Sequence, residues 1–184
     1  MARSSSLVFP FFALVLLPLT AGCGEASSGQ AQSPDQTSSQ SSDLRFDPCR
    51  PLVLVVQDGA TPEEAAGVEA AARAWNDAAG AQVTVASAGS VTTAAPQVPV
   101  SFQRAATPSH GFFDPVAGRV LINEDLAGHP LAVTIAHEVG HAFGLVHVTG
   151  RPSVMNPGNL DVDPNTGDVG ALATLWGACS GGSQ

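Results

Sequence analysis

The sequence predicts an α+β domain. Short apolar runs rich in β-branched residues, which are typical of buried strands, alternate with segments whose apolar side chains recur at helical spacing. Along the chain the order is strand, helix, several strands, helix, loop, helix. With 44% hydrophobic residues among 184, the chain is long and apolar enough for one such domain with a sizeable core.

Residues 1–22 precede this domain and are predicted to be a signal peptide. A positively charged start is followed by LVFPFFALVLLPLT, which is too short to span a bilayer comfortably, and then by AGC. This arrangement resembles a bacterial lipoprotein signal, with cleavage before Cys23 and a lipid on its thiol, although Thr20 stands where an aliphatic residue is usual. The alternatives are ordinary secretion with cleavage nearby and a transmembrane anchor that is retained. All three interpretations of this segment place the domain outside the cytoplasm.

Residues 23–45 are predicted to be a disordered tether that leads to the folded domain, residues 46–184. The tether is rich in Ser and Gln and has almost no large apolar side chain, so it cannot bury enough surface to fold. A flexible chain of this length reaches roughly 25 Å. We therefore expect a membrane-anchored lipoprotein, periplasmic or on the cell surface, or a secreted protein if Cys23 carries no lipid.

The domain is predicted to begin with a strand and a helix. PLVLVVQ, residues 51–57, is apolar and β-branched, as a buried strand would be. Residues 61–80 show helical spacing, and Trp75 lies on the apolar face, where it is expected to join the core. The predicted capping residues are Thr61 and Glu64 at the start and Gly80 at the end.

Three further strands and two further helices complete the pattern. The strands are predicted at 82–87, 97–103 and 118–125. The second helix is expected to begin near His129–Pro130 and to reach Phe143, and a last helix is expected after a loop.

Two cysteines remain if Cys23 is lipidated. Cys49 and Cys179 lie at the two ends of the predicted domain, and outside the cytoplasm such a pair is expected to form a disulfide. In the chain-entropy model a bridge over so long a loop contributes roughly 4–5 kcal/mol. The rival interpretation is that Cys49, in FDPCRP, is an inhibitory thiolate for a metal. The bridge is favoured because Cys179 otherwise has no partner.

The charge composition excludes one class of partner. The formal net charge is −9 and the chain has no lysine, so no basic surface for a nucleic-acid backbone is expected. Acidity of this size favours solubility. We expect the domain to be a monomer.

Residues 137–147, HEVGHAFGLVH, contain three of the five histidines in the chain. On a helix, His137 and His141 are four residues apart and project side by side. The apolar residues of the same helix fall on the opposite face. Glu138 points about a quarter-turn away from the histidine pair. It is thus close to a metal held by the pair without being forced to bind it.

A catalytic zinc site needs three protein ligands and one open position. His147 is the candidate third ligand, but a continuing helix would carry it well away from the other two. Gly144 removes this difficulty, because glycine can adopt a left-handed conformation, end the helix and turn the chain back. The pattern HExxHxxGxxH therefore predicts one catalytic Zn²⁺ bound by His137, His141 and His147, with Glu138 as general base. A structural zinc would more often use cysteines and would have no need of the glutamate.

The sequence resembles the metzincin metalloproteases, and among them the matrixins. HEVGHAFGLVH is similar to their zinc signature, and Met155, eight residues past His147 in SVMNP, resembles their Met-turn, a hydrophobic floor beneath the histidines. SHGFFDP and GRVLINEDLAG are similar to the matrixin stretch in which an edge strand receives the substrate. The resemblance implies a matrixin-like domain with a twisted mixed sheet, three helices and zinc in the cleft.

The sequence also departs from the matrixin pattern. Val148 stands where matrixins usually have Ser after the third histidine, and no inhibitory Cys-bearing propeptide is expected. His110 and His129 are the remaining histidines and are interpreted as surface or strand residues. A second, structural zinc is therefore not expected.

A calcium site is conceivable from the sequence but unsupported. DVDPNTGD, residues 161–168, has an Asp-x-Asp-x-Asn spacing suggestive of Ca²⁺. Its glycine is misplaced for an EF-hand loop and no glutamate closes it. The segment is expected to lead into the last helix, with Asn165 or Thr166 as the cap.

Together these features predict an extracytoplasmic zinc endopeptidase that hydrolyses peptide bonds of proteins or peptides. Zinc would lower the pKa of its bound water towards ~7, Glu138 would take the proton, and the hydroxide would attack the carbonyl. The substrate is expected to lie extended along an edge strand. The alternative is a surface-tethered, non-enzymatic binding module that retains a metzincin zinc site, which a turnover assay would distinguish.

Overall fold

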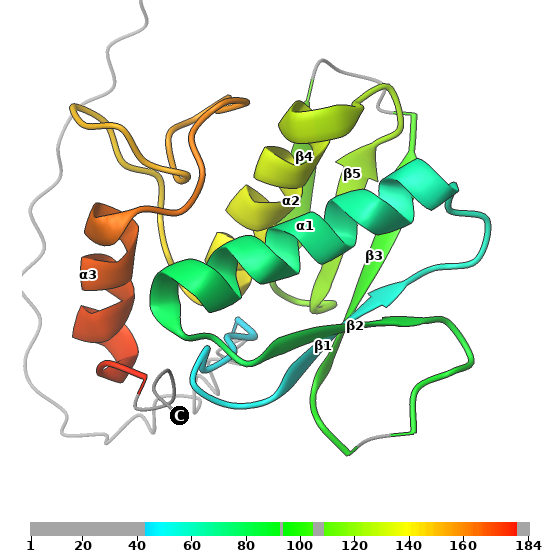
Figure 1. The fold of residues 1–184 in the computed structure, drawn as a ribbon, viewed down its shortest axis with the longest axis horizontal. Coiled ribbons are helices and arrows are strands. Elements are labelled where there is room, and N and C mark those ends of the chain that lie inside the picture. Colours follow the sequence, from blue (N-terminus) through cyan, green and yellow to red (C-terminus); the bar gives the residue numbers. More distant parts are fainter. Residues whose placement is uncertain (1–42, 93, 105–108, 180–184) are drawn as a thin grey trace, which may run out of the picture. The chain divides into compact units, whose positions relative to one another are not determined.

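Five strands form one sheet in the order β2-β1-β3-β5-β4 (Figure 1). The pairs β1–β2, β1–β3 and β3–β5 are parallel, whereas β4 runs antiparallel to β5 at the edge. The sheet is therefore mixed, as predicted. Its strands are β1 Leu52–Val56, β2 Val83–Ser87, β3 Gln97–Gln103, β4 Gly111–Asp114 and β5 Arg119–Asn123.

The computed structural model describes residues 43–92, 94–104 and 109–179, all within the unit Gln40–Gln184. The predicted signal peptide, Cys23 and most of the tether lie outside these residues. Residues 43–45, the predicted end of the tether, lie against the domain, since the Leu44 N–H donates to the Pro115 carbonyl over 2.8 Å. None of the described helices combines the length and the apolar character that crossing a membrane requires.

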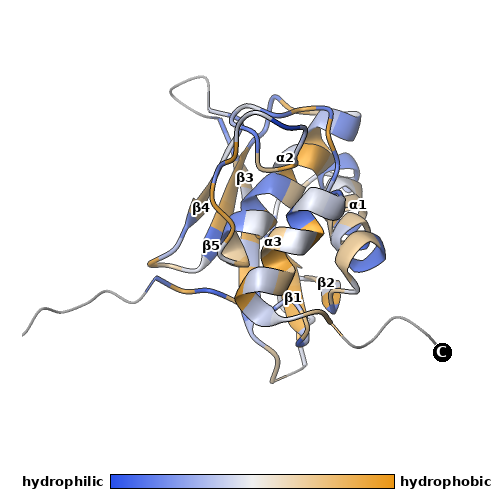
Figure 2. Ribbon diagram, turned by 90° about the vertical axis from the view of Figure 1, so that its left-hand side faces the viewer, coloured by the Kyte–Doolittle hydropathy of each residue, from blue (hydrophilic) through white to orange (hydrophobic). Residues whose placement is uncertain are grey.

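Within the described residues, three helices accompany the sheet, as predicted. They are α1 Pro62–Ala79, α2 Gly128–Ala142 and α3 Thr166–Trp176. Helix α1 contacts β1 and β2, and α2 contacts β4 and β5. Figure 1 shows α1 and α2 crossing the same face of the sheet, and Figure 2, turned by 90°, shows both on one side of the strands.

Helix α1 begins and ends where its sequence predicts. The Thr61 hydroxyl accepts a hydrogen bond from the Glu64 N–H (3.2 Å), and the Glu64 carboxylate accepts one from the Thr61 N–H (2.6 Å). These reciprocal bonds form a capping box. At the other end Gly80 has φ 64°, a left-handed conformation that stops the helix.

The core lies between the sheet and helices α1 and α2. Trp75 of α1 is fully buried, as predicted, and packs edge-on against Phe143 with ring centroids 5.6 Å apart. Its indole N–H also donates to the carbonyl of Ala136, within α2, over 2.8 Å. Trp75 therefore fixes α2 relative to α1 by packing and by a buried hydrogen bond.

The predicted disulfide between Cys49 and Cys179 is confirmed, with Cα atoms 4.9 Å apart. It joins residues separated by 130 positions, one just before β1 and the other just after α3. The rival interpretation of Cys49 as an inhibitory thiolate is wrong, because its sulfur is part of the bridge.

Candidate active site

Helix α2 presents two histidines from the side that faces away from its buried stripe. Its apolar positions are almost inaccessible to solvent, as predicted: Leu131, Ile135, Val139 and Ala142. His137 and His141 follow each other by one turn, with ring centroids 4.9 Å apart. The helical period thus brings both imidazoles to one place.

Gly144 turns the chain so that the third histidine meets the first two. It has φ 93°, and the Leu145 N–H that follows donates to the Gly140 carbonyl over 2.9 Å, which closes the end of the helix. His147 then lies with its Nε2 3.1 Å from the Nε2 of His137 and 3.2 Å from that of His141. Gly144 therefore lies in the turn that follows α2 and its C-cap residue, Phe143.

The geometry of the three nitrogens fits a metal. Two nitrogens bound at 2.0–2.1 Å to a tetrahedral zinc lie about 3.3 Å apart, close to the spacing found here. The Nδ1 atoms of His137 and His141 donate to the carbonyls of Val154 (2.6 Å) and Leu145 (2.9 Å). Because Nδ1 carries the proton, the lone pair of each Nε2 is left for a metal.

The electrostatic surroundings keep two of these imidazoles neutral. Burial lowers the pKa of His137 to about 4, against the opposing effect of its bond to Val154. Burial also lowers the pKa of His141. The neutral imidazole is the form that binds a metal ion.

Glu138 lies between α2 and the edge strand β4 and is only 6% exposed. A Cβ at Gly111 would lie 2.9 Å from the Cγ and the Oε1 of Glu138, so the carboxyl group occupies the space that this glycine leaves. Burial raises the pKa of Glu138 to about 7, although a hydrogen bond from the Phe113 backbone acts in the opposite direction. The side chain is therefore a carboxyl group that can exchange a proton near neutral pH.

Met155 packs against the helix between the two histidines of α2. It is 1% exposed, and a Cβ at Gly140 would lie 2.5 Å from its sulfur. The Val148 N–H, just after the third histidine, donates to the Met155 carbonyl over 3.1 Å. This hydrogen bond joins the loop that holds Met155 to the segment that carries His147.

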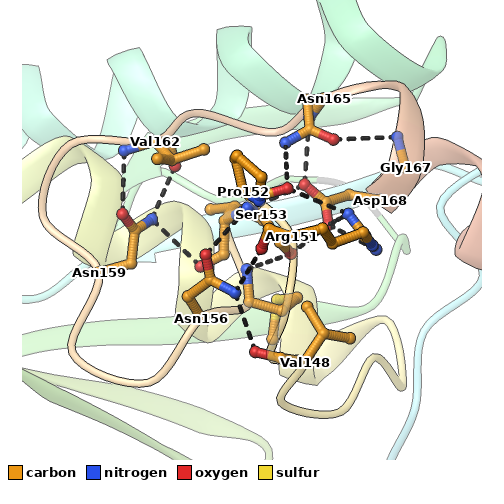
Figure 3. A network of polar contacts seen from close by, with 12 residues as sticks. Val148, Arg151, Pro152, Ser153, Asn156, Asn159, Val162, Asn165, Gly167 and Asp168 are labelled. Atoms are coloured by element: carbon orange, nitrogen blue, oxygen red, sulfur yellow. Dashed lines mark hydrogen bonds and ion pairs between the residues drawn. The ribbon is translucent and has the colours of Figure 1, made fainter.

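Asp168, which the sequence did not single out, holds this loop in place (Figure 3). Its carboxylate is 1% exposed and accepts hydrogen bonds from the Ser153 hydroxyl and from the N–H groups of Val154 and Asn165 (3.1 Å each). The carbonyl of the same Val154 accepts the Nδ1 bond of His137. Asp168 therefore connects the start of α3 to a histidine of the cluster through one residue.

Cavities open on both sides of the histidine cluster along β4. One, of about 390 Å³, lies beside Phe112, Pro115 and Val146, and the other, of about 280 Å³, lies beside His110 and residues 157–159. Glu138 and His147 line both. Thr134 lines the smaller cavity, and its hydroxyl is the one buried side-chain polar atom of the described residues without a hydrogen-bond partner.

The two remaining histidines are not members of this cluster, and His110 lines the smaller of the two cavities beside it. His129 is exposed and its Nε2 lies 3.2 Å from the Asp161 carbonyl, while His110 lies just before β4. Among the described residues, the three histidines of residues 137–147 are the group of His, Cys, Asp or Glu side chains arranged to hold a metal ion. The segment suggestive of calcium leads into α3 with Asn165 as its cap, as predicted.

Comparison with curated proteins finds similarity over a short segment. The chain is 47% identical over 60 residues to a mouse protein (Mus musculus), A disintegrin and metalloproteinase with thrombospondin motifs 18. It is 45% identical over 60 residues to the human (Homo sapiens) protein of the same name. The segment makes up 32% of this chain and only 5% of each relative. No protein-family model matches the chain.

Comparison with solved structures finds a similar fold, at low sequence identity, in archaemetzincin. Archaemetzincin from Methanopyrus kandleri superposes with a TM-score of 0.52 at 15% identity, over 71% of this chain and 98% of that chain. Myroilysin gives a TM-score of 0.41 at 21% identity, over 60% of this chain and 57% of that one. The described residues therefore have a metzincin-type fold, with a mixed sheet, three helices and the histidine cluster of an HExxH helix.

Proposed function

We propose that this chain is a zinc-dependent endopeptidase of matrixin-like type. The observation that carries the proposal is the convergence of three imidazole Nε2 atoms, 3.1 and 3.2 Å apart, next to the buried carboxyl of Glu138. The position of Met155, eight residues past His147 and packed against Gly140 of α2, supports the matrixin-like assignment.

His137, His141 and His147 would hold one Zn²⁺ through their Nε2 atoms, and a catalytic zinc with three protein ligands keeps one further position for water or substrate. When bound, zinc lowers the pKa of a water molecule and polarises a peptide carbonyl. A single catalytic ion is expected.

Glu138 would act as the general base and then as the general acid. A carboxyl group with a pKa of about 7 accepts the proton of the attacking water and returns it to the leaving amine without a large energetic penalty in either direction. Its place between the histidine cluster and β4 supports this role, because a peptide bound along that strand would lie next to it.

Strand β4 would bind the substrate. It is the last strand of the sheet, and its outer edge borders both cavities. A protein or peptide substrate in an extended conformation can add to this edge through backbone hydrogen bonds, with its side chains in the cavities.

A cleavage assay with the full chain tests this function. The chain is purified in detergent, loaded with zinc and incubated with a diverse peptide library, and the products are identified by mass spectrometry. Cuts are expected that disappear with a chelator and in Glu138→Gln, while the variant still binds one zinc per chain. A folded, zinc-loaded chain that cuts no peptide would instead favour the non-enzymatic binding module.

We also propose that the domain is a monomer held outside the cytoplasm at a membrane by a lipid on Cys23. The disulfide between Cys49 and Cys179 supports an oxidising compartment. The chain made in bacteria is expected to partition with membranes, and Cys23→Ala to release it into the soluble fraction. Equal partitioning of both proteins would contradict the lipid anchor.

A further inference from the structure

Arg45 differs from the other arginines of the described residues in having no carboxylate partner. The chain has seven arginines and no lysine, and six of the seven are described. The other five each lie 3.0–3.6 Å from an acidic side chain: Arg50–Asp47, Arg73–Glu69, Arg104–Glu124, Arg119–Asp114 and Arg151–Asp168. In an acidic protein, one unpaired arginine is a group to which a ligand carboxylate can bind.

The backbone on both sides of Arg45 is fixed to the domain. The preceding Leu44 N–H donates to the Pro115 carbonyl, after β4, over 2.8 Å. The following Phe46 N–H donates to the Ala142 carbonyl, at the end of α2, over 2.9 Å. Arg45 therefore bridges the end of the edge strand and the end of the helix that bears the histidines.

The side chain of Arg45 lies across Gly144. A Cβ at this glycine would lie 3.1 Å from the Cδ of Arg45 and 3.7 Å from its Nε. The glycine that ends α2 thus also leaves room for the arginine stem. Arg45 is an exposed residue, so its guanidinium group is available to a ligand.

Arg45 lines the cavity of about 390 Å³, together with Glu138, His141 and His147. Three large apolar side chains of the same cavity are exposed: Leu44 (44%), Phe112 (55%) and Val146 (72%). The acidic groups that line it are Glu138, beside the histidines, and the exposed Asp43. The cavity therefore combines an apolar wall with a single cation.

The direction of β4 decides which half of a substrate meets this cavity. Antiparallel addition places the N-terminal half of a peptide beside the C-terminal end of β4. Phe113 lies in the C-terminal half of β4 and Pro115 directly after the strand, and both line the cavity with Arg45. Residues 112–115 match about four residues of an extended peptide.

We propose that Arg45 binds an acidic side chain of the substrate, within about four residues on the N-terminal side of the scissile bond. The proposal rests on the proposed peptidase function and specifies its substrate class: peptides with an Asp or Glu among apolar residues before the cut. Because the pair remains partly exposed, the preference for an acidic over a neutral side chain is expected to be about three- to fivefold in kcat/KM. It should weaken at high salt, which screens exposed charges.

The test compares two arginines with the same charge change. The full chain in detergent, loaded with zinc, is prepared as wild type, Arg45→Gln, Arg45→Glu, Arg73→Gln and Arg73→Glu. Arg73 lies on α1, is exposed, pairs with Glu69 and does not line the cavity. Each protein is assayed on peptides from the wild-type cleavage profile that differ only by Glu, Gln or Lys at the acidic position. Zinc content and Tm are measured to confirm folding.

The Glu-to-Gln ratio of kcat/KM is expected to fall to about one in Arg45→Gln, and Arg45→Glu is expected to prefer Lys. Both Arg73 variants should keep the wild-type ratio, which excludes an effect of net charge. A wild-type profile without acidic enrichment before the cut, or a ratio unchanged in both Arg45 variants, overturns the proposal. If the wild-type protein cuts no peptide at all, the peptidase function itself fails, which is a separate outcome.

Discussion

Glu138 is ionisable and yet only 6% exposed, because α2 and β4 close over it. Its neighbour in sequence, His137, is 7% exposed. Burial raises the pKa of Glu138 to about 7 and lowers that of His137 to about 4, because the charged form is disfavoured in both cases. The pKa values of these two adjacent residues are thus shifted in opposite directions.

These two groups affect the stability of the metal-free protein with opposite signs. Between pH 6.5 and 4, the unfolded chain protonates His137 and the native state does not, so acidification destabilises the fold. Between pH 4.5 and 7, the native state holds the proton of Glu138 and the unfolded chain does not, so acidification stabilises it. One proton of difference changes the free energy of unfolding by up to about 1.4 kcal/mol per pH unit.

Glu138→Gln removes the stabilisation that the protonation of Glu138 gives the native state on acidification. We expect the metal-free variant to lose stability faster than the wild type as the pH falls from 6.5 to 4.5, the window shared by the two groups. Urea unfolding at several pH values in the presence of a chelator measures this slope. Glu69→Gln, at an exposed site on α1, should leave the slope unchanged. Parallel curves for wild type and Glu138→Gln would contradict the raised pKa.

Gly111 is required by the position of Glu138 rather than by its own backbone. A Cβ here would lie 2.9 Å from atoms of Glu138 and Thr134, so Gly111→Ala should displace the glutamate. We expect turnover to fall roughly 10–100-fold while zinc content is retained, because a small misplacement of a reacting group is enough. Gly170→Ala, in α3 with nothing within 4 Å, is the control. Equal turnover in both variants would show that Glu138 tolerates the shift.

At the scale of elements, three segments converge to build the site. Helix α2 carries two histidines, the turn after it carries the third, and the loop before α3 places Met155 against Gly140. The Asp168 network connects this loop to α3 (Figure 3). Val154 links Asp168 to His137. Its N–H donates to the Asp168 carboxylate, and its carbonyl accepts the hydrogen bond that orients the His137 imidazole.

Asp168→Asn tests this connection. Asp168 accepts the Ser153 hydroxyl on one carboxylate oxygen and two backbone N–H groups on the other. An amide has only one oxygen, so it cannot accept all three bonds, and we expect a loss of about 1–3 kcal/mol in stability. Because His137 loses its orientation, zinc affinity should fall by about 10–100-fold. Competition with a chelator measures the affinity. Thr61→Ala, which removes the cap of α1, should cost about 1 kcal/mol without changing zinc affinity.

At the scale of the whole molecule, the disulfide joins the two ends of the described chain. Cys49 precedes β1 and Cys179 follows α3, so the bridge holds the first strand and the last helix together. Its sequence separation of 130 makes the restriction of the unfolded chain large.

Replacing both cysteines, Cys49→Ser with Cys179→Ser, is expected to lower the free energy of unfolding by up to about 4–5 kcal/mol. The histidine cluster lies on α2 and the loops after it, so a variant that remains folded should still bind zinc. Chemical denaturation gives the stability, and metal analysis of the folded fraction gives the zinc content. A variant as stable as the oxidised wild type would show that the bridge has no influence on the unfolded chain.

The sequence by itself determined the local features. The capping box of α1, the helical face of α2 and the glycine that ends it follow from spacing and from backbone propensities that act within a few residues. Four of the five strands were predicted from their apolar runs. Strand β4 has only four residues, too few for a clear alternation, and only the resemblance to matrixins indicated an edge strand there.

Only the tertiary structure decided which distant groups meet. Asp168 lies 31 residues after His137 and affects it through Val154, and no spacing in the sequence indicates such a contact. Arg45, assigned to the tether by composition, lies beside Gly144 because backbone hydrogen bonds on both sides fix it there. The pKa values of His137 and Glu138 likewise depend on burial by β4 and the Met155 loop, which the fold creates and local sequence does not specify.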